Sequence, residues 1–153
     1  MKRDNCKTSI GIFLTGLVIA ASGAMQEARA DKTCSNHTLK GTYGFSQLGA
    51  VLGIAPFPVT AADVGIVSGD GFGNLTGSET VNVGGQVFTD TFANGTYQVN
   101  PDCTGTASWT AIFSNGAPPQ ARSASFVIVD NGKEVHFLST GPGTVLVGIA
   151  RKQ

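Results

Sequence analysis

The chain has 153 residues, and its ten basic and ten acidic side chains leave no formal net charge at pH 7. The basic residues are few and scattered, which excludes the positive surface that nucleic-acid-binding proteins need. Apart from one run near the start, no apolar stretch approaches the length of a membrane span.

The first thirty residues predict a secretory signal peptide. They start with a basic stretch, continue through an apolar run at residues 10–21, and end on Ala28-Arg29-Ala30, which has the small residues of a cleavage site. The apolar run is short for a membrane span, which disfavours the alternative of an uncleaved anchor. We therefore expect cleavage after Ala30, a secreted or periplasmic protein, and one domain formed by residues 31–153.

Two cysteines remain after cleavage, Cys34 near the new N-terminus and Cys103 in the middle of the chain. An even pair in an exported protein predicts a disulfide bond. The alternatives are two free thiols or a metal site. Two cysteines and two distant histidines lack the spacing of a metal-ligand set, so we predict no metal. No stretch carries a cofactor-binding motif, so we predict no cofactor.

The rest of the sequence is typical of an all-β protein. No long segment repeats apolar residues at helical spacing, and short strand-like runs alternate with glycine-rich turns instead. In chain order, the predicted strands are residues 39–48, 60–68, 75–83, 86–99, 104–113, 121–129, 133–139 and 144–151.

The stretch from Gly95 to Trp109 is predicted to be a strand, a tight turn and a second strand. Asn100-Pro101-Asp102 has turn residues, since proline fixes φ and the Asn and Asp side chains bond nearby backbone groups. The pair Gly84-Gly85 predicts another hairpin. Asn94-Gly95 predicts a bulge inside the long strand that precedes the central turn.

Connections this short favour antiparallel pairing of strands that follow one another in the chain. An open sheet of eight such strands would leave two exposed edges, whereas pairing the first strand with the last removes them. We therefore predict a single antiparallel up-and-down barrel of about eight strands, with a β-sandwich as the alternative.

Several motifs occur in an order that is found in known proteins. Cys34 precedes Gly-Thr-Tyr-Gly-Phe (41–45), a Gly-x-Gly-Asn-x-Thr-Gly turn (71–77), Gly-Thr-Tyr-x-Val-Asn-x-Asp-Cys-Thr-Gly (95–105) and an apolar last strand (143–150). This layout resembles small secreted bacterial β-barrel proteins of unknown function. More distantly, its architecture resembles the calycin-like barrels of allene oxide cyclases and dirigent proteins, a resemblance that implies an eight-stranded barrel holding an apolar ligand. No catalytic motif matches, so no catalytic residue is carried over.

Strand alternation places polar residues among aromatic ones on the same faces. Asp90 lies between Phe88 and Phe92 in the two-residue repeat, and Arg122 shares a face with Phe126. If these faces point inward, the two charged groups must be paired or lie at a wet mouth, because burying an unpaired charge is costly. The alternative is that Asp90 faces solvent. The predicted ligand-binding residues are Tyr43, Phe88, Asp90, Phe92, Trp109, Arg122 and Phe126.

These features favour a non-catalytic barrel that binds a small apolar molecule, with the apolar loop at residues 49–59 as a lid. One alternative is a cyclase or isomerase in which Asp90 polarises an apolar substrate, assisted by Arg122 or Tyr43. Another is a structural or surface-interaction protein whose barrel is solid.

Overall fold

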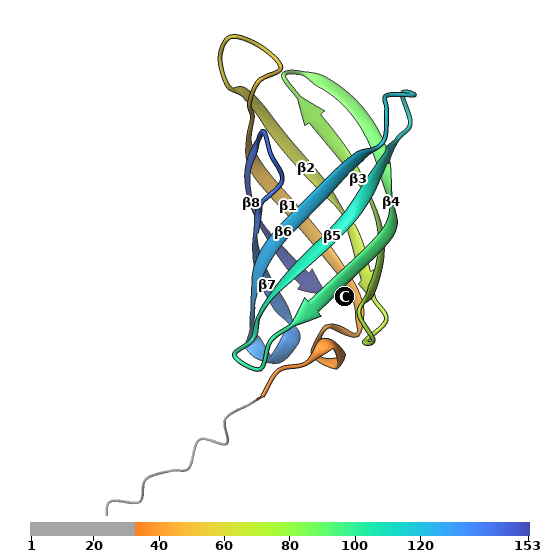
Figure 1. The fold of residues 1–153 in the computed structure, drawn as a ribbon, viewed down its shortest axis with the longest axis vertical. Coiled ribbons are helices and arrows are strands. Elements are labelled where there is room, and N and C mark those ends of the chain that lie inside the picture. Colours follow the sequence, from red (N-terminus) through yellow and green to blue (C-terminus); the bar gives the residue numbers. More distant parts are fainter. Residues whose placement is uncertain (1–32) are drawn as a thin grey trace, which may run out of the picture. The chain divides into compact units, whose positions relative to one another are not determined.

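The computed structural model describes residues 33–153, which form a closed barrel of eight antiparallel strands (Figure 1). The strands are β1 (Gly41–Val51), β2 (Val59–Gly69), β3 (Asn74–Val83), β4 (Gln86–Val99), β5 (Thr104–Phe113), β6 (Gln120–Val129), β7 (Glu134–Ser139) and β8 (Thr144–Lys152), and the 3-10 helices are η1 (Asn36–Leu39) and η2 (Asp130–Gly132). Each strand pairs with its neighbours in sequence, and β1 also pairs with β8, which closes the sheet. The barrel prediction is confirmed, and the sandwich alternative is wrong.

The predicted strand boundaries agree closely with those of the structure. The bounds of β4 and β5 are the predicted ones, and most others differ by one residue at one or both ends. β1 is the exception, because Leu39 belongs to η1 and residues 49–51 extend the strand by pairing with β2 and β8. The bulge predicted at Asn94-Gly95 is confirmed by a register shift there. The predicted signal peptide lies outside the described residues.

Glycines on the inner wall make room for aromatic rings from neighbouring strands. A Cβ atom at Gly105 would overlap the ring of Phe126, and one at Gly148 would overlap the ring of Phe137. Only glycine allows a ring to lie directly over the backbone at such positions. The rings therefore fill much of the barrel interior without spreading the strands.

The N-terminal segment closes one end of the barrel (Figure 1). The predicted disulfide between Cys34 and Cys103 is present and ties this segment to the turn between β4 and β5. The side-chain oxygen of Asn36 accepts a 2.8 Å hydrogen bond from the Val99 amide, and its carbonyl oxygen accepts one of 3.1 Å from the Tyr97 hydroxyl. The disulfide is consistent with an oxidising location, extracellular or periplasmic.

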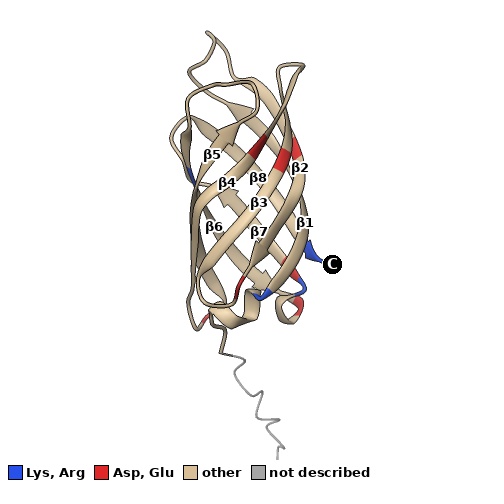
Figure 2. Ribbon diagram, turned by 90° about the vertical axis from the view of Figure 1, so that its right-hand side faces the viewer, with Lys and Arg blue, Asp and Glu red and all other residues tan. Residues whose placement is uncertain are grey.

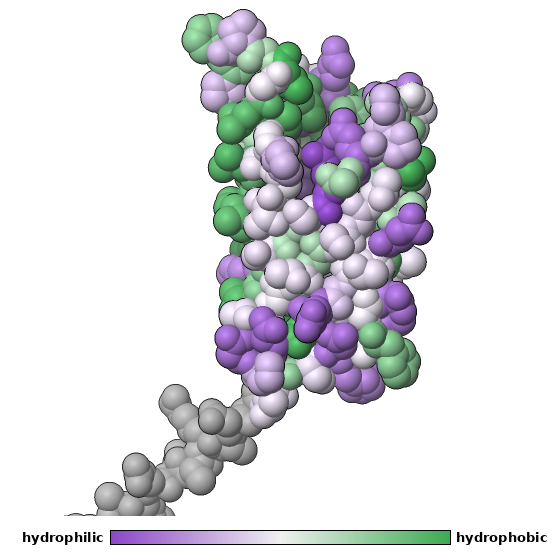
Figure 3. Space-filling model, viewed as in Figure 1, coloured by the Kyte–Doolittle hydropathy of each residue, from purple (hydrophilic) through white to green (hydrophobic). Residues whose placement is uncertain are grey.

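One side of the outer wall is apolar. Leu48 on β1, Val64 on β2 and Val147 on β8 are all well exposed, and Leu48 and Val147 are register partners. Figure 3 shows apolar side chains along this side of the barrel. Within residues 33–153, no helix has the length and apolar character of a membrane span.

Replacing Gly105 by alanine is expected to destabilise the barrel by about 1–3 kcal/mol, the usual range for overpacking. The added methyl group would meet the Phe126 ring and the carbonyl oxygen of Gln98. Thermal unfolding followed by circular dichroism should show a Tm several degrees lower. Gly141→Ala is the matched control, because the nearest atom to its Cβ would lie 3.8 Å away. Equal Tm values for the two variants would contradict the packing argument.

Candidate functional site

The barrel interior contains three adjacent spaces. The apolar cavity, of about 120 Å³, lies toward the end that η1 closes, and the mouth, of about 540 Å³, lies at the other end. A space of about 40 Å³ lies between them. We call the polar residues around this middle space the acidic layer: Gln47, Asp63, Glu79, Asp90 and Arg122. Gln47 and Glu79 also line the apolar cavity, and Arg122 also lines the mouth, so the layer separates the two larger spaces.

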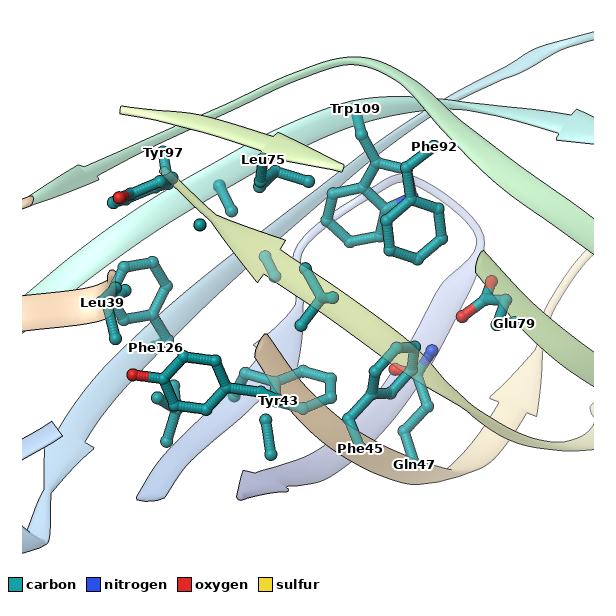
Figure 4. Close-up of a pocket in the computed structure, with 17 residues that line it drawn as sticks. Leu39, Tyr43, Phe45, Gln47, Leu75, Glu79, Phe92, Tyr97, Trp109 and Phe126 are labelled. Atoms are coloured by element: carbon teal, nitrogen blue, oxygen red, sulfur yellow. The ribbon is translucent and has the colours of Figure 1, made fainter. Parts of the chain in front are cut away.

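Aromatic rings form much of the wall of the apolar cavity. The ring centroids of Phe92 and Trp109 lie 5.1 Å apart, and that of Phe45 lies 6.3 Å from Phe92 and 6.1 Å from Phe137. Figure 4 shows the rings around this space, with Gln47 and Glu79 at one end. The lining residues are Leu39, Tyr43, Phe45, Gln47, Val67, Gly69, Leu75, Glu79, Phe92, Tyr97, Ala107, Trp109, Ala124, Phe126, Val135, Phe137 and Ala150.

At the closed end of this cavity, the two tyrosine hydroxyls already have hydrogen-bond partners. Tyr43 donates a 2.6 Å bond to the Gly132 carbonyl. The Tyr97 hydroxyl donates to the Asn36 carbonyl at 3.1 Å and accepts from the Gly71 amide at 2.9 Å. A ligand would therefore find its polar partners at the opposite end, in the acidic layer.

Three carboxyl groups come from β2, β3 and β4: Asp63 and Asp90 are buried, and Glu79 is half-buried. Figure 2 shows acidic positions at one level of these neighbouring strands. Glu79 and Asp90 are register partners whose carboxyl groups hydrogen-bond to each other. Asp63 accepts a 2.7 Å hydrogen bond from Nε2 of its register partner Gln47. Within the described part of the chain, four buried side-chain atoms lack a hydrogen-bond partner, and all belong to this region: Asp63 Oδ1, Glu79 Oε2, Asp90 Oδ1 and Trp109 Nε1.

Burial makes these carboxyl groups bind protons tightly. Loss of hydration raises the pKa of Asp63 to about 7, although the Gln47 hydrogen bond opposes the shift. Burial, together with the charges of Asp63 and Asp90, raises the pKa of Glu79 to about 9. Burial also raises the pKa of Asp90, against the hydrogen bond from Glu79. At pH 7, Glu79 is therefore protonated, and its carboxyl O–H donates the hydrogen bond that Asp90 accepts.

One cation faces these three acids. Arg122 is half-buried on β6, and its charge favours the ionised form of all three carboxyl groups. It takes part in neither of the salt bridges found among the described residues. Its guanidinium carbon lies 6.0 Å from the centroid of the Phe113 ring. With all three acids ionised, the layer would carry a net negative charge.

All seven residues predicted to bind a ligand line the lumen. The apolar cavity is lined by Tyr43, Phe92, Trp109 and Phe126, and the middle space is lined by Phe88, Asp90, Trp109 and Arg122. The alternative that Asp90 faces solvent is wrong, because the residue is only 3% exposed. The period of a strand does not by itself say which face points inward, and closure of the barrel decides it here. Their role in binding stays a prediction.

Three members of the acidic layer, Gln47, Asp63 and Glu79, are absent from the predicted set. For Glu79 the sequence does carry a signal. A two-residue turn at Gly84-Gly85 fixes the hairpin register, and counting outward from it places Glu79 opposite Asp90. Asp63 has no comparable signal, because the loops on both sides of β2 are longer.

No protein-family model matches the chain, and comparison with curated proteins and with solved structures gives no match. The two family resemblances stay predictions. Across residues 33–153, no group of three or more His, Cys, Asp or Glu side chains is arranged to hold a metal ion. The function is therefore inferred from the lumen itself.

The stability of the barrel is expected to fall as the pH rises from 4 to 9. The three carboxyl groups bind protons more tightly in the folded state than in the unfolded chain, so this stabilisation is lost as the pH passes the folded pKa values, about 7 for Asp63 and about 9 for Glu79. Urea unfolding at several pH values should show a progressive loss of several kcal/mol, because a rise of one unit in pKa corresponds to about 1.4 kcal/mol.

Asp63→Asn should reduce the part of this loss that falls between pH 4 and 7, because the amide does not titrate. Glu134→Gln is the control. The pKa of Glu134 is lowered by its hydrogen bonds to Arg151 and His136, so its contribution changes only below about pH 4.5. If the free energy of unfolding stays level or rises from pH 5 to 9, the conclusion that the folded protein holds protons on these carboxyl groups is wrong.

Proposed function

We propose that the barrel binds one small, largely apolar molecule in its lumen. The observation that carries this proposal is the apolar cavity of about 120 Å³, whose wall is almost entirely aromatic and aliphatic. A protein cavity of roughly 150 Å³ with a similar lining binds benzene. The apolar cavity therefore suits a single ring or a short chain, and a longer ligand would extend through the acidic layer toward the mouth.

The mouth supports a route of entry for this ligand. The loop between β1 and β2, the predicted lid, lies at the rim of the barrel (Figure 1), and its residues Leu52 and Ile54 line the mouth. Both side chains are exposed. They would gain apolar contact by folding over a bound molecule, which favours a lid role for this loop.

A cyclase or isomerase is the second candidate function, and the buried acid pair favours it. Asp90 lines the middle space and shares a hydrogen bond with protonated Glu79, which also lines the apolar cavity. Through Glu79, this pair is placed to exchange a proton with a molecule in that cavity. Mass spectrometry of the molecule recovered from the protein separates the two functions. If the molecule recovered after incubation is identical to the apolar molecule that was added, the result supports binding alone, whereas a rearranged product supports an enzyme.

We also propose that the protein is exported and cleaved after Ala30. The disulfide and the sequence of the first thirty residues support this. Intact-mass analysis of the protein expressed with all of its residues in a bacterium that has a periplasm should give an N-terminus at Asp31. A periplasmic fraction without the protein, or a mass that includes the first thirty residues, would contradict it.

Binding in the apolar cavity should change the fluorescence of Trp109, the single tryptophan of the chain. Toluene is the probe, because its ring suits the cavity volume. Ala107→Leu, which fills part of the cavity, is expected to weaken toluene binding at least tenfold, or about 1.4 kcal/mol. The same change at Ala121, on the outer face of β6, should leave binding unchanged. Equal binding by the two variants would place toluene elsewhere.

A further inference from the structure

We propose that the ligand is a cationic amine, with an ammonium group held in the acidic layer and a small apolar ring or chain in the apolar cavity. This inference rests on the proposed ligand-binding function and names the class of molecule that the lumen accepts. It follows from the unused hydrogen-bonding capacity of the layer, from its charge balance and from its position beside the apolar cavity.

The hydrogen-bonding capacity of the layer matches an ammonium group. Asp63 and Asp90 are 5% and 3% exposed; Asp63 leaves Oδ1 without a partner, and Asp90 Oδ1 and Glu79 Oε2 have no partner apart from the hydrogen bond that these two carboxyl groups share. The three residues that carry these oxygens line a space of about 40 Å³. That volume exceeds the 10–15 Å³ or so that a group the size of a water molecule occupies by the same measure. A primary ammonium group has three N–H donors, and three carboxyl groups border this space.

The charge balance of the layer also calls for a cation. The charged or titratable residues that line this space are Asp63 on β2, Glu79 on β3, Asp90 on β4 and Arg122 on β6. The other four strands contribute only uncharged residues: Gln47, Trp109, Ser139, Thr144 and Leu146. Three acids thus face one cation. Without a ligand the layer stays near neutrality by holding protons, and a bound ammonium group would take their place.

The surroundings of the layer set the direction in which such a ligand lies. Figure 4 shows Glu79 at the end of the apolar cavity beside Phe92 and Trp109. Both rings belong to the cavity wall, and aromatic faces attract ammonium groups. The opposite end offers no charged group, and its polar groups, the hydroxyls of Tyr43 and Tyr97, already hydrogen-bond to the protein. The ring of the ligand therefore points toward η1 and its ammonium group toward the mouth.

This arrangement couples amine binding to proton release. The ammonium group pairs with ionised carboxyl groups, and burial keeps these groups protonated at low pH. The affinity for an amine is therefore expected to rise with pH between 5 and 8, about tenfold per pH unit for each proton released. The affinity for a neutral ring of the same size has no such dependence on the layer's charge.

The test compares benzylamine, benzyl alcohol and toluene on the exported chain, with binding followed by Trp109 fluorescence and by calorimetry at pH 5 and pH 8. Benzylamine is expected to bind at least tenfold more tightly than benzyl alcohol at pH 8, and this preference should shrink at pH 5. Asp63→Asn should remove most of the preference. Glu134→Gln, which neutralises an acid on the outer wall, should preserve it.

The outcomes separate this inference from the proposed function. The amine assignment would be overturned if toluene and benzyl alcohol bound as tightly as benzylamine at pH 8. It would also be overturned if the preference for benzylamine did not change between pH 5 and 8. Either result would leave the proposed apolar site in place. No binding of any of the three probes would overturn the proposed function itself. Because the pH comparison uses the unmodified chain, it decides the question even if Asp63→Asn fails to fold.

Discussion

Closure of the sheet between β1 and β8 is the constraint on which the lumen depends. The pairing runs from Tyr43 opposite Lys152 to Val51 opposite Thr144, so no strand keeps a free edge. Every strand then turns alternate side chains into one enclosed space. In an open sheet, the same carboxyl groups would lie in water and titrate normally. In the closed barrel they share a small interior with aromatic rings, which is why they bind protons so tightly.

The apolar cavity persists because the barrel is closed at one end by the N-terminal segment rather than by larger side chains. η1 places Leu39 against the cavity, and the bond between Cys34 and Cys103 holds the segment on the turn between β4 and β5. Small residues complete the wall, among them Ala107 and Ala124, where larger side chains would fill the space. The closed end is thus well bonded, and the unfilled volume lies deeper inside the barrel.

We expect the acidic layer to lower stability at neutral pH, and this cost supports the proposed binding function. Apolar side chains of similar volume generally stabilise an interior at least as well as buried ionisable groups do. Here the unpaired buried atoms found within residues 33–153 are concentrated in one layer and on the adjoining Trp109. They lie next to a cavity that the rest of the interior leaves unfilled. Binding sites often combine residues that lower stability with an adjacent unfilled cavity, and the acidic layer and the apolar cavity have this arrangement.

The sequence by itself determined the strands, the turns, the disulfide and the closed barrel, because these depend on local conformation, on a two-residue period and on the cost of free edges. It also placed Asp90 on one face with Phe88 and Phe92. Only the tertiary structure decided that this face points inward, since a period of two is the same for either face. It alone brought Asp63 to the pair formed by Glu79 and Asp90, because their proximity depends on register across three strands joined by loops of different length. The volume left among the rings was likewise a tertiary outcome, set by how side chains from all eight strands pack together.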